Sequence, residues 1–303
     1  MVMTMTTIDE QAAVLALTKA TRDKPWFYTA RIILDAGSAL ALLDRRCASR
    51  DADDRAHAAD ITAQVLPGDL AWARDLVTAM RDDGVHLVTV LDDAYPGNLM
   101  WAYDRQPFLW IRGDIRPNDH RSVAVIGEVD SGHAASAARA LAQAGITVVA
   151  PLRSALDAAV HQAAHDAGGR TLAVLSGGIA EPATVDEYAS MAEQIANCGA
   201  LVSAFWPDAA PTDRTVALSR IVTCGLADCL YVVDGAAGGS SAGHVEQALQ
   251  TGKYVFVSQR LHQEQPWAAR AGSRGGMTAV QDIDELPKQA VNLIDMTPGT
   301  NTY

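Results

Sequence analysis

Residues 121–150 read RSVAVIGEVDSGHAASAARALAQAGITVVA, and the pattern repeated along the second half of the chain is complete in this stretch. It opens with an apolar run, VAVI at 123–126, continues through a Gly-containing loop and an alanine-rich segment of helical length, and closes with ITVV at 146–149. Short, continuous apolar runs that alternate with helices are typical of parallel strands buried on both faces. The stretch therefore predicts a strand–helix–strand unit.

The same alternation continues towards the C-terminus. Further strands are expected in TLAVLSGG, ALVSAF, DCLYVVDG and KYVFVSQ, and helices are expected over residues 133–144, 154–167, 185–197, 214–226 and 243–251. The segment MTAVQDIDELPKQAVNLI adds a last strand and a short helix. The predicted fold class is α/β, with a doubly wound, Rossmann-like, mostly parallel sheet.

The chain before this region has a different sequence pattern. Apolar residues at helical spacing dominate the first eighty positions, and Pro67-Gly68 interrupts them, whereas GVHLVTVLDDAYPGNL and QPFLWIRGDIRPND each contain a strand-like run. We therefore expect three parts: a small N-terminal α-helical domain at 1–80, an extended Rossmann-like domain at 81–290 and a C-terminal tail at 291–303.

Composition narrows the possible functions. With 24 Lys and Arg against 36 Asp and Glu, the net charge is −12, which argues against a protein that coats nucleic acid by bulk electrostatics. Any nucleic-acid site must then be a focused pocket. The apolar runs are too short to cross a membrane, and the N-terminus lacks the pattern of a secretory signal, so we expect a cytoplasmic protein. The 4 cysteines have no CxxC spacing, and no metal is predicted.

The most informative loops follow the predicted strands, because ligands of such sheets bind outside the carboxyl ends of the strands. GAAGGSSAGH at 235–244 is the strongest signal, since glycines and two adjacent serines before a helix offer backbone donors and hydroxyls to a phosphate. No Gly-Lys-Ser/Thr and no GxGxxG is present, so neither a Walker site nor a dinucleotide cofactor is indicated. The alternative is that these glycines only turn the chain.

Two other groups of residues invite a chemical interpretation. Asp157, His161 and His165 share one predicted helix face and could present metal ligands, but Asp157 is better explained as a first-turn carboxylate favoured by the helix dipole. An aromatic cluster lies near two arginines, a combination that stacks bases, yet Phe108 and Trp110 belong to an apolar run and are expected in the core. No nucleophile–base–acid order is detectable, and no catalytic residue is assigned.

A family resemblance becomes visible once these segments are placed in order. DDAYPGNL, PFLWIRGDI, VAVIG, ITVVAPLRSALDAAVHQAAHDAGGRTLAVLSGGI and SRIVTCGLADCLYVVDGAAGGSSAGHVEQALQTGKYVFVSQ resemble successive motifs of the DNA-processing protein A (Smf) family, over most of residues 85–285. The resemblance implies a protein without enzymatic activity or cofactor that binds single-stranded DNA, forms a homodimer and helps to load a RecA-type recombinase. The helical N-terminal part corresponds to the family's small helical (SAM/HhH-like) module.

The chain also departs from the family pattern. Where the first loop of the family reads Gly-Ser-Arg, this chain has Gly127-Glu128-Val129, which removes a cation and adds a carboxylate. The Arg of the second loop falls on Ser154, with Arg153 one place earlier. We expect the DNA phosphates to be bound by the remaining polar and small residues of these loops. The expected site comprises Gly127, Arg153, Ser154, Arg220, Ser240, Ser241, His244 and Lys253.

Two alternative functions remain open from the sequence. Glu246, three residues after Gly243, resembles the glutamate of a GGxGTxxE segment in Rossmann-like phosphoribohydrolases, so a nucleotide-handling protein is one alternative. An exposed helix glutamate is the simpler explanation of the same residue. The other alternative is a scaffold that retains the fold without a ligand.

Overall fold

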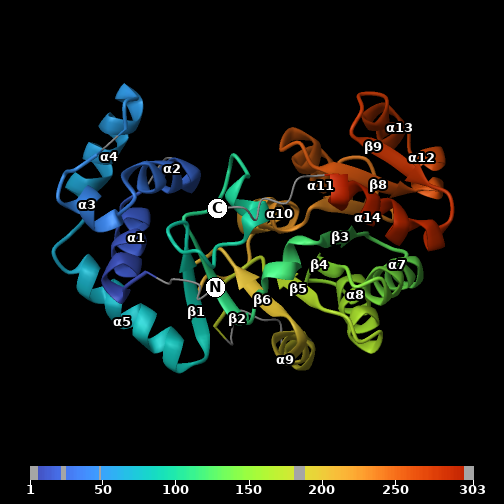
Figure 1. The fold of residues 1–303 in the computed structure, drawn as a ribbon, viewed down its shortest axis with the longest axis horizontal. Helices are drawn as coiled ribbons and strands as arrows, with labels where there is room; N and C mark the ends of the chain where they lie inside the picture. The colour runs from blue at the N-terminus through green and yellow to red at the C-terminus, as the bar shows by residue number, and fades with distance from the viewer. Residues whose placement is uncertain (1–5, 22–24, 48, 181–187, 297–303) are drawn as a thin grey trace. The chain divides into compact units, whose positions relative to one another are not determined.

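The computed structural model describes residues 6–21, 25–47, 49–180 and 188–296. The chain forms two compact units: Met1–Tyr95 with Tyr103–Arg112, and Pro96–Ala102 with Gly113–Tyr303 (Figure 1). The expected boundary near residue 80 falls in the last turn of α5 (Asp69–Asp82), the helix that precedes the hairpin of the first unit. That hairpin packs with the helices of the first unit, because the side-chain amide of Gln11 donates to Leu87 O at 2.9 Å.

The first unit combines helices with one antiparallel hairpin. Its central helix is buried nearly all round, with Val14, Leu15 and Leu17 at 0% exposure. Polar caps begin three of the helices: Thr7, Ser38 and Asp51 each accept a backbone N–H. The elements are α1 (Ile8–Ala20), α2 (Trp26–Ala36), α3 (Ala39–Leu43), α4 (Ala52–Gln64), α5 (Asp69–Asp82), β1 (Val85–Thr89) and β2 (Phe108–Gly113).

The second unit contains a parallel sheet whose strands, among the described residues, follow the order β6-β5-β4-β3-β7-β8-β9. All neighbouring pairs in this run are parallel. The strands are β3 (Ser122–Ile126), β4 (Thr147–Pro151), β5 (Thr171–Val174), β6 (Ala200–Ser203), β7 (Cys229–Val232), β8 (Tyr254–Ser258) and β9 (Met277–Val280). The predicted doubly wound α/β class is confirmed.

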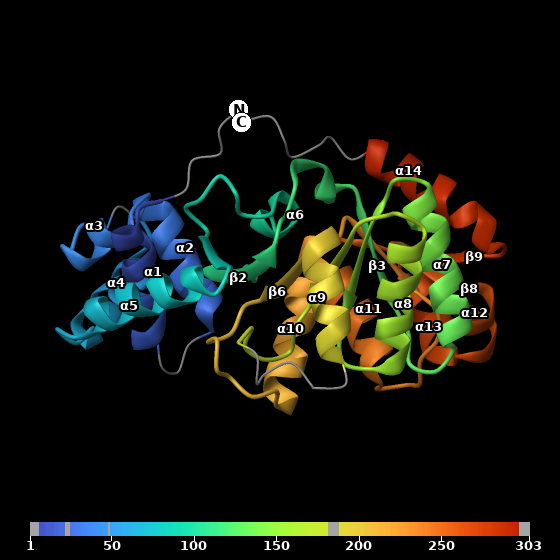
Figure 2. The same cartoon turned by 90° about the horizontal axis from the view of Figure 1, so that it is seen from below.

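Helices cover both faces of this sheet. Neighbouring helices α14, α7, α8 and α9 lie along one face, and α10 packs beside α11 on the other (Figure 2). The elements are α6 (Gly97–Met100), η1 (Pro117–His120), α7 (Ser131–Gln143), α8 (Ala155–Asp166), α9 (Ala189–Cys198), α10 (Asp213–Leu226), α11 (Ser240–Gln250), α12 (Gln259–Glu264), α13 (Pro266–Gly272), η4 (Ile283–Glu285) and α14 (Leu286–Met296). The helix expected over 185–197 begins at Ala189, and residues 181–187 lie outside the described part.

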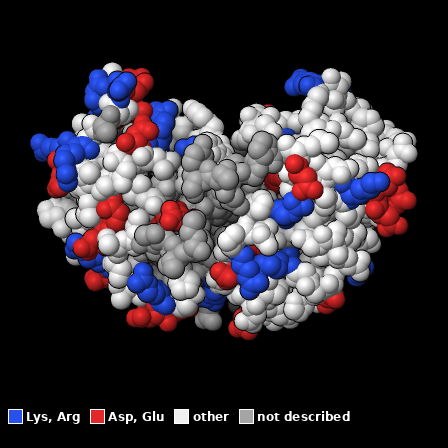
Figure 3. Space-filling view, in the orientation of Figure 1, with Lys and Arg blue, Asp and Glu red and all other residues white. Residues whose placement is uncertain are grey.

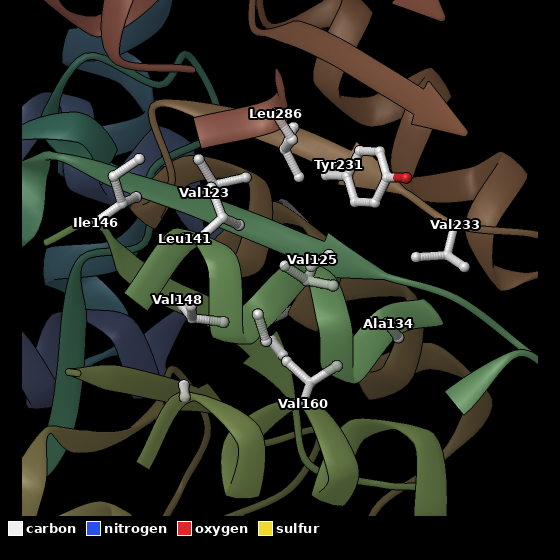
Figure 4. Packing of buried hydrophobic residues seen from close by; sticks show 14 of the residues in the cluster. Val123, Val125, Ala134, Leu141, Ile146, Val148, Val160, Tyr231, Val233 and Leu286 are labelled. Carbon is white, nitrogen blue, oxygen red and sulfur yellow. The ribbon is translucent and has the colours of Figure 1, made fainter. Parts of the chain in front are cut away.

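The core of the second unit lies between the sheet and the helices α7, α8 and α14. Small residues on the inner face of α7 let this helix approach the sheet closely, and Ala134, Ala137 and Ala138 are each 0% exposed. Val125 of β3 and Tyr231 of β7 fill the space against them (Figure 4). Burial of such side chains stabilises the fold by about 1.5–3 kcal/mol for each large aliphatic residue. The core therefore fixes β3 and β7 as neighbours.

The aromatic residues between positions 101 and 110 differ in their burial. Phe108 and Trp110 are fully buried, which confirms their assignment to the core, while Trp101 and Tyr103 are 61% and 68% exposed. None of the helices among the described residues has the length and apolar character needed to cross a bilayer.

Candidate functional site

The candidate site lies where the winding direction of the sheet reverses. Strands β3 and β7 are hydrogen-bonded neighbours, but the helices that follow them, α7 and α11, lie on opposite faces. The loops at 127–130 and 234–239 therefore separate from each other at the carboxyl edge of the sheet, and this is the position at which doubly wound proteins bind ligands. The predicted location of the site is thus a geometric property of the fold.

A carboxylate from the loop after β7 fills the first of these loops. Asp234, two residues past the end of the strand, accepts backbone N–H bonds from Glu128 at 2.6 Å, Val129 at 3.2 Å and Asp130 at 2.6 Å. Arg260 at the start of α12 adds charge balance, with its guanidinium 3.2 Å from Asp130 and 3.8 Å from Asp234. The amides that precede α7 therefore already hold an anion supplied by the chain.

A second carboxylate connects the same two loops in the opposite direction, from the loop after β3 to the loop after β7. Glu128, in the loop after β3, accepts from Ser241 N at 2.9 Å and from Ala236 N at 3.2 Å. A Cβ atom at Gly239 would overlap Glu128 Oε1, so glycine is required at 239 for the carboxylate to reach the start of α11. The serine-rich loop thus holds an anion, and that anion is a side chain of the same protein.

The loop after β4 shows the same arrangement on a local scale. Ser154 begins α8, and Asp157 Oδ2 accepts from the N–H groups of Arg153 and Ser154 at 3.0 Å each. Burial raises the pKa of the Asp157 carboxyl, while these hydrogen bonds act in the opposite direction. The expectation that Asp157 is a first-turn carboxylate is confirmed.

Two guanidinium groups approach the start of α11. Arg153 Nη2 donates to Ser240 Oγ at 3.3 Å, and Arg220, projecting from α10, lies directly against Gly243. Within the described part of the chain, Arg220 Nε has no hydrogen-bond partner, and neither has the hydroxyl of Ser241, a residue with 0% exposure. The helix start therefore offers donors that are not yet used.

His244 belongs to this group of residues as a structural member. It is 2% exposed, its Nδ1–H donates to Ser240 O at 2.8 Å, and burial lowers its pKa to about 4. The imidazole is therefore neutral near pH 7 and brings no charge to a phosphate. Arg153 and Arg220 are the cations that the site can use.

Of the expected site residues, Arg153, Ser154, Arg220, Ser240, Ser241 and His244 lie at the carboxyl edge of the sheet, and Gly127 adjoins Asp234 there. Lys253 does not join them, because it immediately precedes β8 and so lies at the amino edge, beside Asp228. The sequence contained a signal for this, since Lys253 is the first residue of KYVFVSQ and so precedes the apolar run of that strand rather than following it. Sequence reasoning also missed the amide-binding roles of Glu128 and Asp234.

The other candidate residues have structural explanations. His161 is 0% exposed and holds Thr171 Oγ1 at 2.6 Å and Pro151 O at 3.0 Å, so both ring nitrogens are engaged. Among the residues that the structure describes, no cluster of His, Cys, Asp or Glu has a metal-binding arrangement. Glu246 is exposed and accepts from Gln250 Nε2 at 3.3 Å, as a simple helix-surface glutamate does.

The surface charge agrees with a small, focused site. On the face shown in Figure 3, Lys and Arg side chains of the second unit lie in small groups among Asp and Glu, and uncharged residues form most of the surface. The positive potential at the site comes from two arginines beside a helix start, because a helix N-terminus itself carries partial positive charge.

The fold and this edge define a Rossmann-like α/β protein with an anion-binding switch point. The model of the family described as DNA recombination-mediator protein A matches residues 86–292, and the chain belongs to this family. It is similar in fold to DNA processing protein A from Streptococcus pneumoniae, with a TM-score of 0.66 at 20% identity over 93% of this chain and 98% of that one.

A second similar structure is DNA processing protein A from Helicobacter pylori, which was described for its single-stranded-DNA binding mode. Its TM-score is 0.59 at 17% identity, over 69% of this chain and 96% of that one. No curated protein matches the chain significantly.

Proposed function

We propose that the protein is a single-stranded-DNA-binding recombination mediator that places a backbone phosphate at the start of α11. The observation that carries the proposal is the convergence of Arg153 and Arg220 on this helix start, beside a buried Ser241 hydroxyl that lacks a partner among the described residues. Charge-assisted bonds from guanidinium groups and free helix N–H groups are the usual means of holding a phosphate.

Glu128 sets the affinity of this site. Its carboxylate holds the N–H groups of Ala236 and Ser241, so a phosphate must displace it before it can bind the same donors. The exchange replaces one anion by another, and only the contacts with Arg153 and Arg220 favour the phosphate. Weak binding by the unmodified protein and tighter binding after removal of Glu128 both follow from this competition.

The test is fluorescence anisotropy of labelled oligo-dT at low salt, with the unmodified chain and the Glu128→Ala variant. In the Glu128→Ala background, Arg220→Gln is expected to weaken binding at least tenfold, because a charge-assisted hydrogen bond contributes about 1.5–3 kcal/mol. Arg214→Gln, on the exposed side of the same helix, serves as the control and is expected to change little. If neither the unmodified chain nor the Glu128→Ala variant binds oligo-dT at micromolar concentration, the proposal is overturned.

The family resemblance supports two finer points of the same proposal. As other members imply, the protein acts as a homodimer in the cytoplasm and passes its DNA to a RecA-type recombinase without enzymatic chemistry of its own. Sedimentation equilibrium tests the dimer. Strand-exchange assays with a RecA-type recombinase test the mediator role, since an active mediator relieves the inhibition caused by a single-stranded-DNA-binding protein.

A further inference from the structure

A second cavity lies at the amino edge of the sheet, opposite the candidate DNA site. Its volume is about 720 Å³, within the range of small-molecule sites, and its lining includes Trp101, Arg121, Asp228, Lys253 and Asp295. All of these residues belong to the second unit. The lining combines an aromatic ring with charged groups of both signs.

Two of the charged groups neutralise each other, and two do not. Arg121 and Asp295 form an ion pair at 2.6 Å. Lys253 Nζ and the Asp228 carboxylate, in contrast, make no hydrogen bond or ion pair with any residue in the described ranges, although each influences the other electrostatically. Burial lowers the pKa of Lys253 and raises that of Asp228, so both groups have lost much of their hydration.

A partly dehydrated ammonium without an acceptor and a partly dehydrated carboxylate without a donor are costly to maintain. They become favourable when a ligand supplies an acceptor to Lys253 and donors to Asp228 at the same time. One part of the cavity lining is held by hydrogen bonds, because Asn98 Nδ2 donates to His120 O at 2.8 Å and to Leu226 O at 3.0 Å.

Trp101 restricts the ligand further. Trp101 lines the cavity, and the residue is 61% exposed, so aromatic surface is available to a ligand. Aromatic side chains of this kind stack on nucleobases. A planar ring that carries an acceptor and neighbouring N–H donors on one edge matches all three groups.

We propose that this cavity is a guanine-binding site. The O6 carbonyl of guanine accepts from Lys253, its N1–H and N2–H₂ groups donate to Asp228, and its ring stacks on Trp101. Adenine presents an amine in place of O6, and a ring nitrogen without a proton in place of N1–H, so it places a donor towards Lys253 and no N–H donor towards Asp228. The site thus discriminates between the two purines. The guanine belongs either to a free nucleotide or to a nucleic-acid strand.

Isothermal titration calorimetry with GMP and AMP tests the proposal on the full chain. We expect GMP to bind with a Kd below about 1 mM and at least tenfold more tightly than AMP. Lys253→Met and Asp228→Asn should each weaken GMP binding at least tenfold, whereas Lys288→Met, an exposed lysine on α14, should leave it unchanged. Circular dichroism confirms that each variant is folded.

Two further experiments test whether the guanine belongs to a strand or to a free nucleotide, and whether the cavity binds it independently of the site at α11. Short oligo-dT with one central guanine, compared with oligo-dT alone, shows whether a strand enters the cavity: a guanine-dependent gain that Asp228→Asn abolishes identifies the strand as the occupant. Arg220→Gln should retain GMP binding, so a failure of DNA binding at α11 does not affect this result. Equal binding of GMP and AMP, unchanged affinity in both cavity variants, or no response to either guanine source would overturn the proposal.

Discussion

Glu128 shows how one substitution changes the state of a binding site without changing the fold. Its carboxylate lies where a phosphate oxygen would bind, with Ser241 N at 2.9 Å and Ala236 N at 3.2 Å. A hydrogen bond from an amide to a carboxylate is among the stronger ones in proteins. The residue therefore stabilises the loop and lowers its availability to other anions.

Removal of this side chain should separate stability from binding. We expect Glu128→Ala to lower the free energy of unfolding by about 1–2 kcal/mol, because two N–H groups lose their acceptor, and to raise the affinity for oligo-dT about tenfold, because the donors become free. Urea denaturation and anisotropy measure the two effects. Glu246→Ala, on the exposed face of α11, should change neither, and a loss of both stability and affinity in Glu128→Ala would contradict this role.

At the scale of elements, the starts of three helices share one device. The amides before α7 bind Asp234, those before α8 bind Asp157, and those before α11 bind Glu128. Each helix start carries unsatisfied N–H groups and the positive end of a dipole, so a carboxylate there is favourable. Asp157 comes from its own helix, whereas Asp234 and Glu128 each come from the opposite loop and so join the two sides of the switch point.

A substitution that fills the space at the start of α11 tests whether a phosphate binds there. Gly239 has an ordinary φ of −76°, so alanine fits its backbone, but the added Cβ occupies the position of Glu128 Oε1. In the Glu128→Ala background, Gly239→Ala should therefore abolish the gain in oligo-dT affinity, returning it about tenfold towards the parent value.

Gly132→Ala is the matched control for that variant. It lies in the first turn of α7, where an added Cβ meets only Asp130 Oδ1 at 3.8 Å, an ordinary contact. The Glu128→Ala protein should keep its affinity for oligo-dT when this control is added. Equal affinities of the Gly239→Ala and Gly132→Ala versions would mean that the phosphate binds elsewhere.

For the whole molecule, pH dependence follows from histidines buried as neutral rings. Burial lowers the pKa of His161 and of His244 to about 4, whereas histidine in the unfolded chain titrates near pH 6.5. Between these values the unfolded state binds more protons than the folded state, so stability falls as the pH falls. The stabilisation is fully present above about pH 6.5 and is lost down to about pH 4.

We expect each buried histidine to account for about 2 kcal/mol of the stability lost between pH 7 and pH 5. Urea denaturation of His161→Asn at both pH values should therefore show a smaller loss than the parent protein by about this amount. His165→Asn, four residues along α8 and exposed, should retain the full loss. If the two variants lose equal stability, His161 is not buried in the neutral form.

The sequence predicted the layered architecture because its determinants are local. Each of these features depends on a few neighbouring residues: the apolar runs VAVI and ITVV, the alanine-rich inner face of α7, and the Ser154–Asp157 helix start. All of them appear in the structure as expected. The edge of the sheet that carries the candidate site followed from the same pattern, because loops after parallel strands meet at one edge. For the same reason, the position of Lys253 before β8 already placed it at the other edge.

The occupant of the site was decided only by the tertiary structure. Glu128 and Asp234 are far apart along the chain, and nothing in the local sequence of either loop indicates which amides its carboxylate binds. They come together because the core makes β3 and β7 neighbours, with Ile126 opposite Val232, while α7 and α11 leave the sheet on opposite faces. The same long-range pairing aligns Asp228 before β7 with Lys253 before β8, and so creates the cavity at the amino edge. The local sequence pattern thus determined where ligands could bind, and the packing of distant strands determined which charged groups lie there.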